Sequence, residues 1–265
     1  MLKIKNITKI FNLDQPIENQ KIALDNVSLD IQNGEFVTII GGNGSGKSTL
    51  MNMICGVYKP EAGEIFIDGV NVTKISENKR AKYIGRVFQD PNMGTAGNMS
   101  ILENMEIAMR RNKVKSLKWG FKKKNAELFK EKLSILNLGL ENRLEHKIGL
   151  LSGGQRQAIT LLMASLAEPK ILLLDEHTAA LDPKTAKTVL DVTEKIVEEN
   201  NITTIMITHN MRDAIKYGNR LIMLSNGKVV LDVKGEEKQN LTIDKLVKMF
   251  ENSEVQLTDS MLLSK

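Results

Sequence analysis

Gly41-Gly42-Asn43-Gly44-Ser45-Gly46-Lys47-Ser48-Thr49 is the stretch of sequence that decides the fold. It contains the pattern G-x-x-x-x-G-K-S and directly follows an apolar run at residues 36–40. Glycines let a loop wrap closely and point several N–H groups inward, and the helix start that follows adds the positive end of its dipole. The pattern therefore predicts a phosphate-binding loop between a buried strand and a helix.

This loop predicts contacts to the phosphates of a nucleotide. Lys47 would reach the β and γ phosphates, and the hydroxyl of Ser48 would ligate Mg²⁺. The alternative is a plain glycine-rich turn, but the four fixed positions should match by chance in only about one chain in a hundred. The residues expected to contact the nucleotide are Gly41, Asn43, Gly44, Ser45, Gly46, Lys47, Ser48 and Thr49.

Two acids end the apolar run at residues 171–174. Asp175 is expected to hold Mg²⁺ through water, and Glu176 to polarise the attacking water as general base. Taken alone, two acids that cap the next turn would be an equal alternative. The phosphate loop upstream favours the catalytic interpretation.

Two further polar residues follow predicted strands. His209 comes after residues 203–208, a strand expected beside the acid-bearing one, so its imidazole would reach the γ phosphate. Gln89 comes after residues 84–88, and its amide would ligate Mg²⁺ and contact the water. For His209 a structural role is the alternative, and for Gln89 ordinary loop polarity.

Leu151-Ser152-Gly153-Gly154-Gln155 predicts a second anion-binding helix start. Ser152 is a good N-cap, and the two glycines free the backbone to approach an anion. Since the chain already has one phosphate loop, this second site predicts a nucleotide that is shared with another subunit.

The fold class predicted is α/β, with a mainly parallel sheet, an antiparallel β part at the N-terminus and a helical insertion. One domain is expected over residues 1–265, with a core at 1–98 and 168–235, helices at 99–167, and a C-terminal helix and tail at 236–265. Strands are predicted at 2–8, 23–31, 35–40, 64–67, 84–88, 171–174, 203–208, 220–224 and 228–232. Helices are predicted at 47–57, 101–111, 125–137, 154–167, 183–199 and 211–217.

Three local signals fix element boundaries. Ser100 and Glu103 form a capping-box pattern, and Asp182-Pro183 is typical of a helix start. Asn226-Gly227 predicts a hairpin turn.

Composition limits the partners. The net charge is +5, but the segment 110–124 alone carries eight cations and no acid, so a general nucleic-acid-binding surface is not expected. The single cysteine excludes an intramolecular disulfide, and no apolar run has the length of a membrane span. Work at a membrane would therefore depend on partner proteins. With Trp119 and Phe121, the basic run fits either an anionic lipid surface or a solvated loop.

Together these motifs resemble the nucleotide-binding subunits of ABC transporters over about residues 2–235. The resemblance rests on the phosphate loop, Gln89, the signature 151–157, the acid pair, the loop 180–182 and His209. It implies ATP and Mg²⁺ as cofactors and a head-to-tail dimer, in which Gly41–Thr49 of one copy and Ser152, Gly153, Gly154 and Gln155 of the other hold each ATP. It also implies that Phe11 stacks on adenine, where Tyr is more usual. Phe11 as an ordinary core residue is the alternative.

The family further implies membrane-spanning permease subunits, a separate solute-binding protein, and a location at the cytoplasmic face of the cell membrane. A permease helix would dock near residues 89–109, where 92–99 is either an adaptable surface or a plain loop. One departure is His177-Thr178, where Pro-Thr is usual. The run 175–183 looks like a bacterial importer subgroup, some of whose members are thought to serve aromatic amino acids.

Three other functions compete with transport. DNA-repair and chromosome-maintenance ATPases place long coiled coils between the equivalents of Gln89 and Leu151, and translation-associated relatives carry two phosphate loops. Neither feature is present in this sequence. A scaffold role is the third alternative, and the sequence does not exclude it. The expected function is ATP hydrolysis that drives import of a small solute, with an amino acid as candidate.

Overall fold

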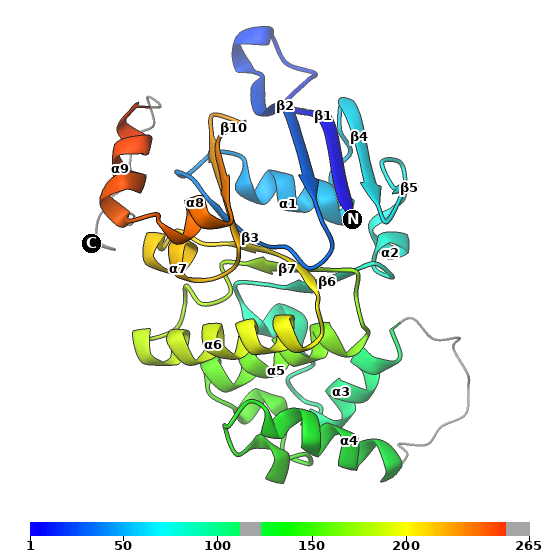
Figure 1. Ribbon diagram of the computed structural model, residues 1–265. Helices are drawn as coiled ribbons and strands as arrows, with labels where there is room; N and C mark the ends of the chain where they lie inside the picture. The colour runs from blue at the N-terminus through cyan, green and yellow to red at the C-terminus, as the bar shows by residue number, and fades with distance from the viewer. Residues whose placement is uncertain (112–122, 253–265) are drawn as a thin grey trace. The chain divides into compact units, whose positions relative to one another are not determined.

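The computed structural model describes residues 1–111 and 123–252 (Figure 1). The chain divides into two compact units, the first made of Met1–Ile84 and Asn201–Lys265 and the second of Gly85–Asn200. Within the described residues, no helix combines the length and apolar character needed to cross a membrane.

An antiparallel sheet opens the first unit. Its strands follow the order β2-β1-β4-β5. β1 pairs with β2 in a register that places Leu2 opposite Ile31, which confirms the predicted antiparallel pairing. β5 was not predicted, because two residues are too few to show an alternating pattern. The strands are β1 (Leu2–Phe11), β2 (Lys21–Ile31), β4 (Ala62–Ile67) and β5 (Val70–Asn71).

Three parallel strands and one antiparallel strand form a second sheet region of the first unit. β3 lies between β8 and β9 and runs parallel to both, and β10 pairs antiparallel with β9. Every residue of β3, β8 and β9 is buried, as expected for strands covered on both faces. Asn226 and Gly227 both have positive φ, which confirms the predicted hairpin turn. The strands are β3 (Phe36–Ile40), β8 (Thr203–Ile207), β9 (Arg220–Ser225) and β10 (Lys228–Lys234).

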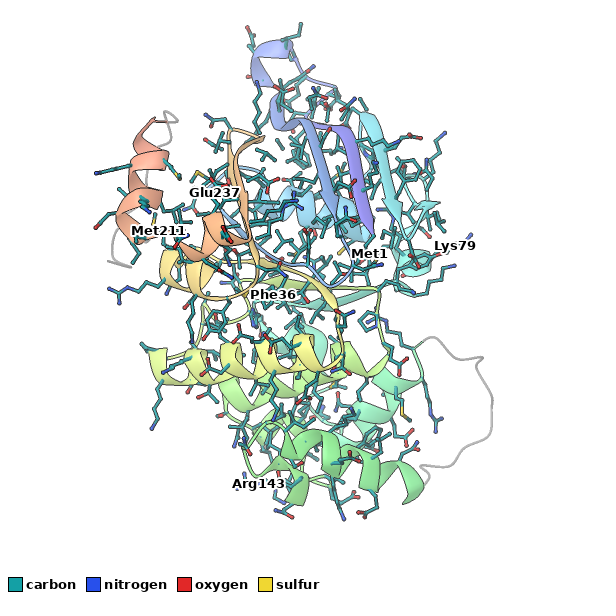
Figure 2. All side chains as sticks on the ribbon, in the orientation of Figure 1. Met1, Phe36, Lys79, Arg143, Met211 and Glu237 are labelled. Atoms are coloured by element: carbon teal, nitrogen blue, oxygen red, sulfur yellow. The ribbon has the colours of Figure 1, made fainter. Side chains whose placement is uncertain are left out.

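Helices α7 and α9 of the first unit pack apolar side chains against these strands. Met211, labelled in Figure 2, starts α7 and packs in a cluster with Ile40 of β3 and Leu246 of α9. Glu237, also labelled there, lies on the short helix α8. The helices are α1 (Lys47–Cys55), α2 (Glu77–Arg80), α7 (Met211–Lys216), α8 (Glu236–Gln239) and α9 (Ile243–Asn252).

Arg80 ties α2 to the end of α1. Its side chain is 1% exposed, and Nη1 donates to the carbonyls of Met53 at 2.7 Å and Ile54 at 3.0 Å. Nε donates to the carbonyl of Ile75 at 2.9 Å. The last carbonyls of a helix have no partner within it, so Arg80 completes the helix that follows the phosphate loop.

We expect Arg80→Met to lower the free energy of unfolding by about 3 kcal/mol or more, because buried carbonyls lose charge-assisted hydrogen bonds. Urea unfolding of both proteins measures the difference. The exposed neighbour Lys79, labelled in Figure 2, provides the control Lys79→Met, which should change stability by less than about 0.5 kcal/mol. Equal losses in the two variants would contradict this role of Arg80.

The described part of the second unit contains the neighbouring strands β6 and β7 and the α-helices α3, α4, α5 and α6. α5 contacts α6, α3 and α4 (Figure 1). The predicted capping box of Ser100 and Glu103 and the N-cap Asp182 are both confirmed. The elements are β6 (Ile84–Val87), α3 (Ile101–Met109), α4 (Lys123–Ser134), α5 (Gly153–Leu166), β7 (Ile171–Asp175) and α6 (Pro183–Glu199).

As predicted, the described part of residues 99–167 forms helices and no strand longer than an isolated bridge between Ser100 and Lys147. Most of the basic run 110–124 lies outside the described residues, Trp119 and Phe121 included. The two interpretations of this run, contact with anionic lipid and a solvated loop, both stay predictions.

Candidate functional site

The phosphate loop packs so closely that two of its positions accept only glycine. A Cβ atom at Gly41 would lie 2.2 Å from the carbonyl oxygen of Leu224, and one at Gly46 would lie 2.5 Å from that of Ala23. Both residues also have positive φ, 156° and 104°, where other residues are strained. The glycines that identified the motif are therefore required by the backbone path of the loop.

The polar groups of this loop fit an anionic ligand. Lys47 is 7% exposed, and its Nζ donates to the carbonyls of Gly41 at 2.8 Å and Gly42 at 3.1 Å. The hydroxyl of Ser45 is buried and has no hydrogen-bond partner, and no side chain caps the start of α1. An ammonium group, an unpaired hydroxyl and an uncapped helix start suit phosphate oxygens. The residues present thus fit the nucleotide predicted for them.

His209 follows the end of β8, which pairs with the strand that precedes the phosphate loop. Ile39 of β3 lies opposite Ile207 of β8, and the N–H of Thr208 donates to the carbonyl of Ile39 at 3.1 Å. Because these neighbouring strands are parallel, Gly41 and His209 each follow the carboxyl end of a strand at the same edge. The half-buried His209 therefore lies at the same sheet edge as the loop, and its predicted contact with the γ phosphate stays a prediction.

Phe11 ends β1 and is half-buried, so it is not enclosed in the core. The ring of Tyr58 lies edge-on to it, with a centroid distance of 5.3 Å, and Nζ of Lys9 lies 5.2 Å from its centroid. Its predicted stacking on adenine stays a prediction.

In the second unit, the signature residues build the start of α5. The N–H of Gln155 donates to Oγ of Ser152 at 3.3 Å, and Oε1 of Gln155 accepts from the N–H of Ser152 at 3.2 Å. Ser152 is thus the predicted N-cap. Gln155, which was predicted to contact nucleotide, completes a capping box that the S-x-x-Q spacing signals and our sequence analysis did not use.

The same helix start packs against α6. A Cβ at Gly154 would lie 2.0 Å from Cγ2 of Thr185, so this glycine permits close approach of the two helices. Further along α5, Nε2 of Gln157 donates to the carbonyl of Phe88 at 3.0 Å. Helix α5, which starts at the signature, therefore holds the carbonyl of Phe88, the residue directly before Gln89.

Asp175 is the last residue of β7 and Glu176 follows it, and the two acids lie in different environments. Glu176 has φ of 45°, a left-handed conformation that is uncommon for a residue with a side chain and often marks a functional site. Oδ2 of Asp175 lies 3.0 Å from Nη2 of Arg86 on β6. This ion pair was missed, since nothing in the local sequence links two residues of different strands.

His177 anchors the segment that carries Glu176. Its ring is buried, and Nε2 lies 3.2 Å from Oγ1 of Thr193 on α6. That hydroxyl already donates to the carbonyl of Val189 at 2.7 Å, so it accepts from the histidine, and Nε2 carries the proton.

We expect acid to destabilise the protein through His177. Burial lowers the pKa of His177 to about 4, from a usual value of 6.5. The unfolded chain therefore binds a proton at higher pH than the folded chain, and stability that is complete above about pH 6.5 is lost as the pH falls through 4. The loss is about 2 kcal/mol at pH 5. Unfolding free energies at pH 7 and pH 5, compared with those of His177→Gln, measure it. An identical pH dependence in the variant would contradict the expectation.

The donors predicted for Mg²⁺ also fit their ion. Ser48, Gln89 and Asp175 supply a hydroxyl, an amide and a carboxylate oxygen, and Mg²⁺ prefers oxygen ligands. Within residues 1–111 and 123–252, no three or more His, Cys, Asp or Glu side chains gather in a group able to hold a metal ion. Mg²⁺ needs no such group where it is bound by one or two protein ligands, substrate phosphates and water.

Similar proteins indicate the family to which this chain belongs. The model of the family described as ABC transporter matches residues 24–179. A tyrosine transport ATP-binding protein of Clostridioides difficile (strain R20291) is 49% identical, over 95% of this chain and 99% of its own length. An energy-coupling factor transporter ATP-binding protein of Clostridium tetani is 35% identical, over 90% of this chain and 80% of its own.

One solved structure shows a related chain with its nucleotide. It is a dimeric ATP-binding cassette of Methanocaldococcus jannaschii in a post-hydrolysis state, bound to ADP and phosphate. It is 35% identical to this chain, with a TM-score of 0.73, and covers 88% of this chain and 98% of its own. With the phosphate loop, the strand-end acids and these relatives all in agreement, the chain belongs to the ABC transporter family as an ATP-binding and ATP-hydrolysing subunit.

Proposed function

We propose that this subunit drives bacterial import of an amino acid, and that tyrosine or a similar aromatic amino acid is the solute. The observation that carries the proposal is the 49% identity, over nearly the full length of both chains, to a protein named for tyrosine transport. His177-Thr178, which follows the acid pair in place of Pro-Thr, supports the same subgroup. The subunit would work at the cytoplasmic face of the cell membrane, bound to permease subunits and served by a separate solute-binding protein.

The residues divide the chemistry as follows. The backbone of the loop 41–49 and Lys47 bind the phosphates, and Ser48, Gln89 and Asp175 hold Mg²⁺. When bound, Mg²⁺ neutralises charge on the phosphate oxygens. Phe11 stacks on the adenine ring.

Glu176 accepts a proton from the attacking water, while Gln89 and His209 orient that water and the γ phosphate. The left-handed backbone at Glu176 and the hydrogen bond from His177 to Thr193 support this arrangement, because both fix the direction in which the carboxylate leaves β7.

The active form proposed is a head-to-tail dimer. Each ATP lies between the phosphate loop of one copy and Ser152, Gly153, Gly154 and Gln155 of the other. Two features support this dimer. The chain has one phosphate loop and, in addition, a glycine-rich helix start at the signature, and the related cassette was solved as a dimer.

Uptake of labelled amino acids by cells tests the transport proposal. Cells that carry only Glu176→Gln should lose high-affinity tyrosine uptake, and the membrane proteins that co-purify with the wild-type chain should include a permease. Normal tyrosine uptake in those cells would contradict the proposal. Another relative is named for methionine import, so methionine is the second solute to assay, and loss of methionine uptake alone would reassign the substrate.

A further inference from the structure

The ion pair between Arg86 and Asp175 joins the two neighbouring strands β6 and β7. Nη2 of Arg86 lies 3.0 Å from Oδ2 of Asp175, and both side chains are mostly buried, with exposed fractions of 17% and 19%. The guanidinium carbon also lies 4.7 Å from the centroid of the Phe88 ring. A carboxylate on one side and an aromatic face on the other thus fix the position of this arginine.

This contact places the positive charge of Arg86 next to Asp175, the carboxylate that is proposed above to hold Mg²⁺. A guanidinium and the water bound to a divalent cation both donate hydrogen bonds to carboxylate oxygens, and the two positive charges repel each other. Partial burial strengthens that repulsion, since interactions between charges away from bulk water are screened less. Arg86 therefore acts on the metal as well as on the carboxylate.

We propose that Arg86 is a positioning residue for Asp175 that competes with the metal ion for its carboxylate, and so sets the Mg²⁺ concentration that the site requires. The inference rests on the proposed role of Asp175 in holding Mg²⁺ through water. Arg86 holds the carboxylate in one orientation at the end of β7. The metal must share or displace that contact to bind, which weakens its binding.

Two substitutions separate the charge of Arg86 from its size. Arg86→Gln keeps a polar side chain that can hydrogen bond to Asp175 but removes the charge, and Arg86→Lys keeps the charge. We expect the first to tighten metal binding about fivefold, which corresponds to about 1 kcal/mol. The second should stay within about twofold of wild type.

The metal can be measured without turnover. Titration of Mn²⁺ into each protein saturated with the non-hydrolysable ATP analogue AMPPNP, followed by electron paramagnetic resonance, gives the concentration of free Mn²⁺, and the bound metal follows by difference from the total. Lys187→Met removes an exposed positive charge on α6 of the same unit and should leave Mn²⁺ binding unchanged. Melting temperatures of all variants show whether each one is folded.

Asp175→Asn distinguishes failure of this inference from failure of the proposed metal site. If Asp175→Asn binds Mn²⁺ as wild type does, Asp175 is not a ligand and the proposed role fails together with the inference. If Asp175→Asn weakens binding but Arg86→Gln is the same as wild type or weaker, the competition is wrong while the metal site stands. The proposal is supported if Arg86→Gln binds Mn²⁺ more tightly than wild type while Arg86→Lys and Lys187→Met do not.

Discussion

Glu176→Gln should lower the ATPase turnover number by a factor of about 10² to 10⁴, while ATP binding stays close to wild type. The substitution removes a group able to accept a proton but keeps the size of the side chain, and a general base typically contributes a factor of this size. Steady-state phosphate release gives the turnover number, and equilibrium binding of a fluorescent ATP analogue gives the affinity. The expectation rests on the position of Glu176, which directly follows β7 in a left-handed conformation.

A matched control for this prediction is Glu198→Gln, which changes an exposed acid near the end of α6 in the same unit. It should leave turnover within about twofold of wild type, because surface substitutions far from a site have small effects. If Glu176→Gln retained turnover within a factor of ten of wild type, another group would be the base.

Lys47→Met should weaken ATP binding by about 100-fold or more. The ammonium of Lys47 is held inside the phosphate loop by two carbonyls of that loop, so it is already placed for the phosphates. Each hydrogen bond to a charged group contributes about 1.5–3 kcal/mol, and two such bonds to phosphate oxygens account for the expected factor. Isothermal titration with ATP measures it.

The control for Lys47 is Lys59→Met, an exposed lysine in the same unit that should change ATP affinity by less than about twofold. The melting temperature without nucleotide is the second control. If folded Lys47→Met still binds ATP as tightly as wild type, this lysine does not contribute to ATP binding.

The parts of the fold that the sequence predicted are those with local causes. Residues 36–40 are apolar except for Thr38 and form a fully buried strand, and Ser100 with Glu103 caps a helix as the spacing indicates. The phosphate loop was recognisable because Gly41, Gly46, Lys47 and Ser48 follow one another in a fixed pattern. Such features need only neighbouring residues in the chain.

The features that were missed depend on contacts between distant residues or on very short elements. Arg86 and Asp175 are 89 residues apart in the chain, and neither residue type indicates the other. The four residues of α2 cannot show a helical period, so the buried Arg80 was unpredictable from pattern alone. His177 was recognised as a departure, but its bond to Thr193 needed the packing of α6 beside the end of β7.

The most direct test of the shared-site account is the ATP-dependent dimerisation of Glu176→Gln. Analytical ultracentrifugation of this variant with Mg²⁺ and ATP, with ADP, and without nucleotide measures the state of the chain. A second variant, Ser152→Arg in the Glu176→Gln background, places a bulky charge at the signature and leaves the phosphate loop intact. If each ATP is shared between two copies, Glu176→Gln forms a dimer with ATP but not with ADP or without nucleotide. The double variant should still bind ATP but stay a monomer. A chain that binds ATP tightly but stays monomeric at every protein concentration would contradict it.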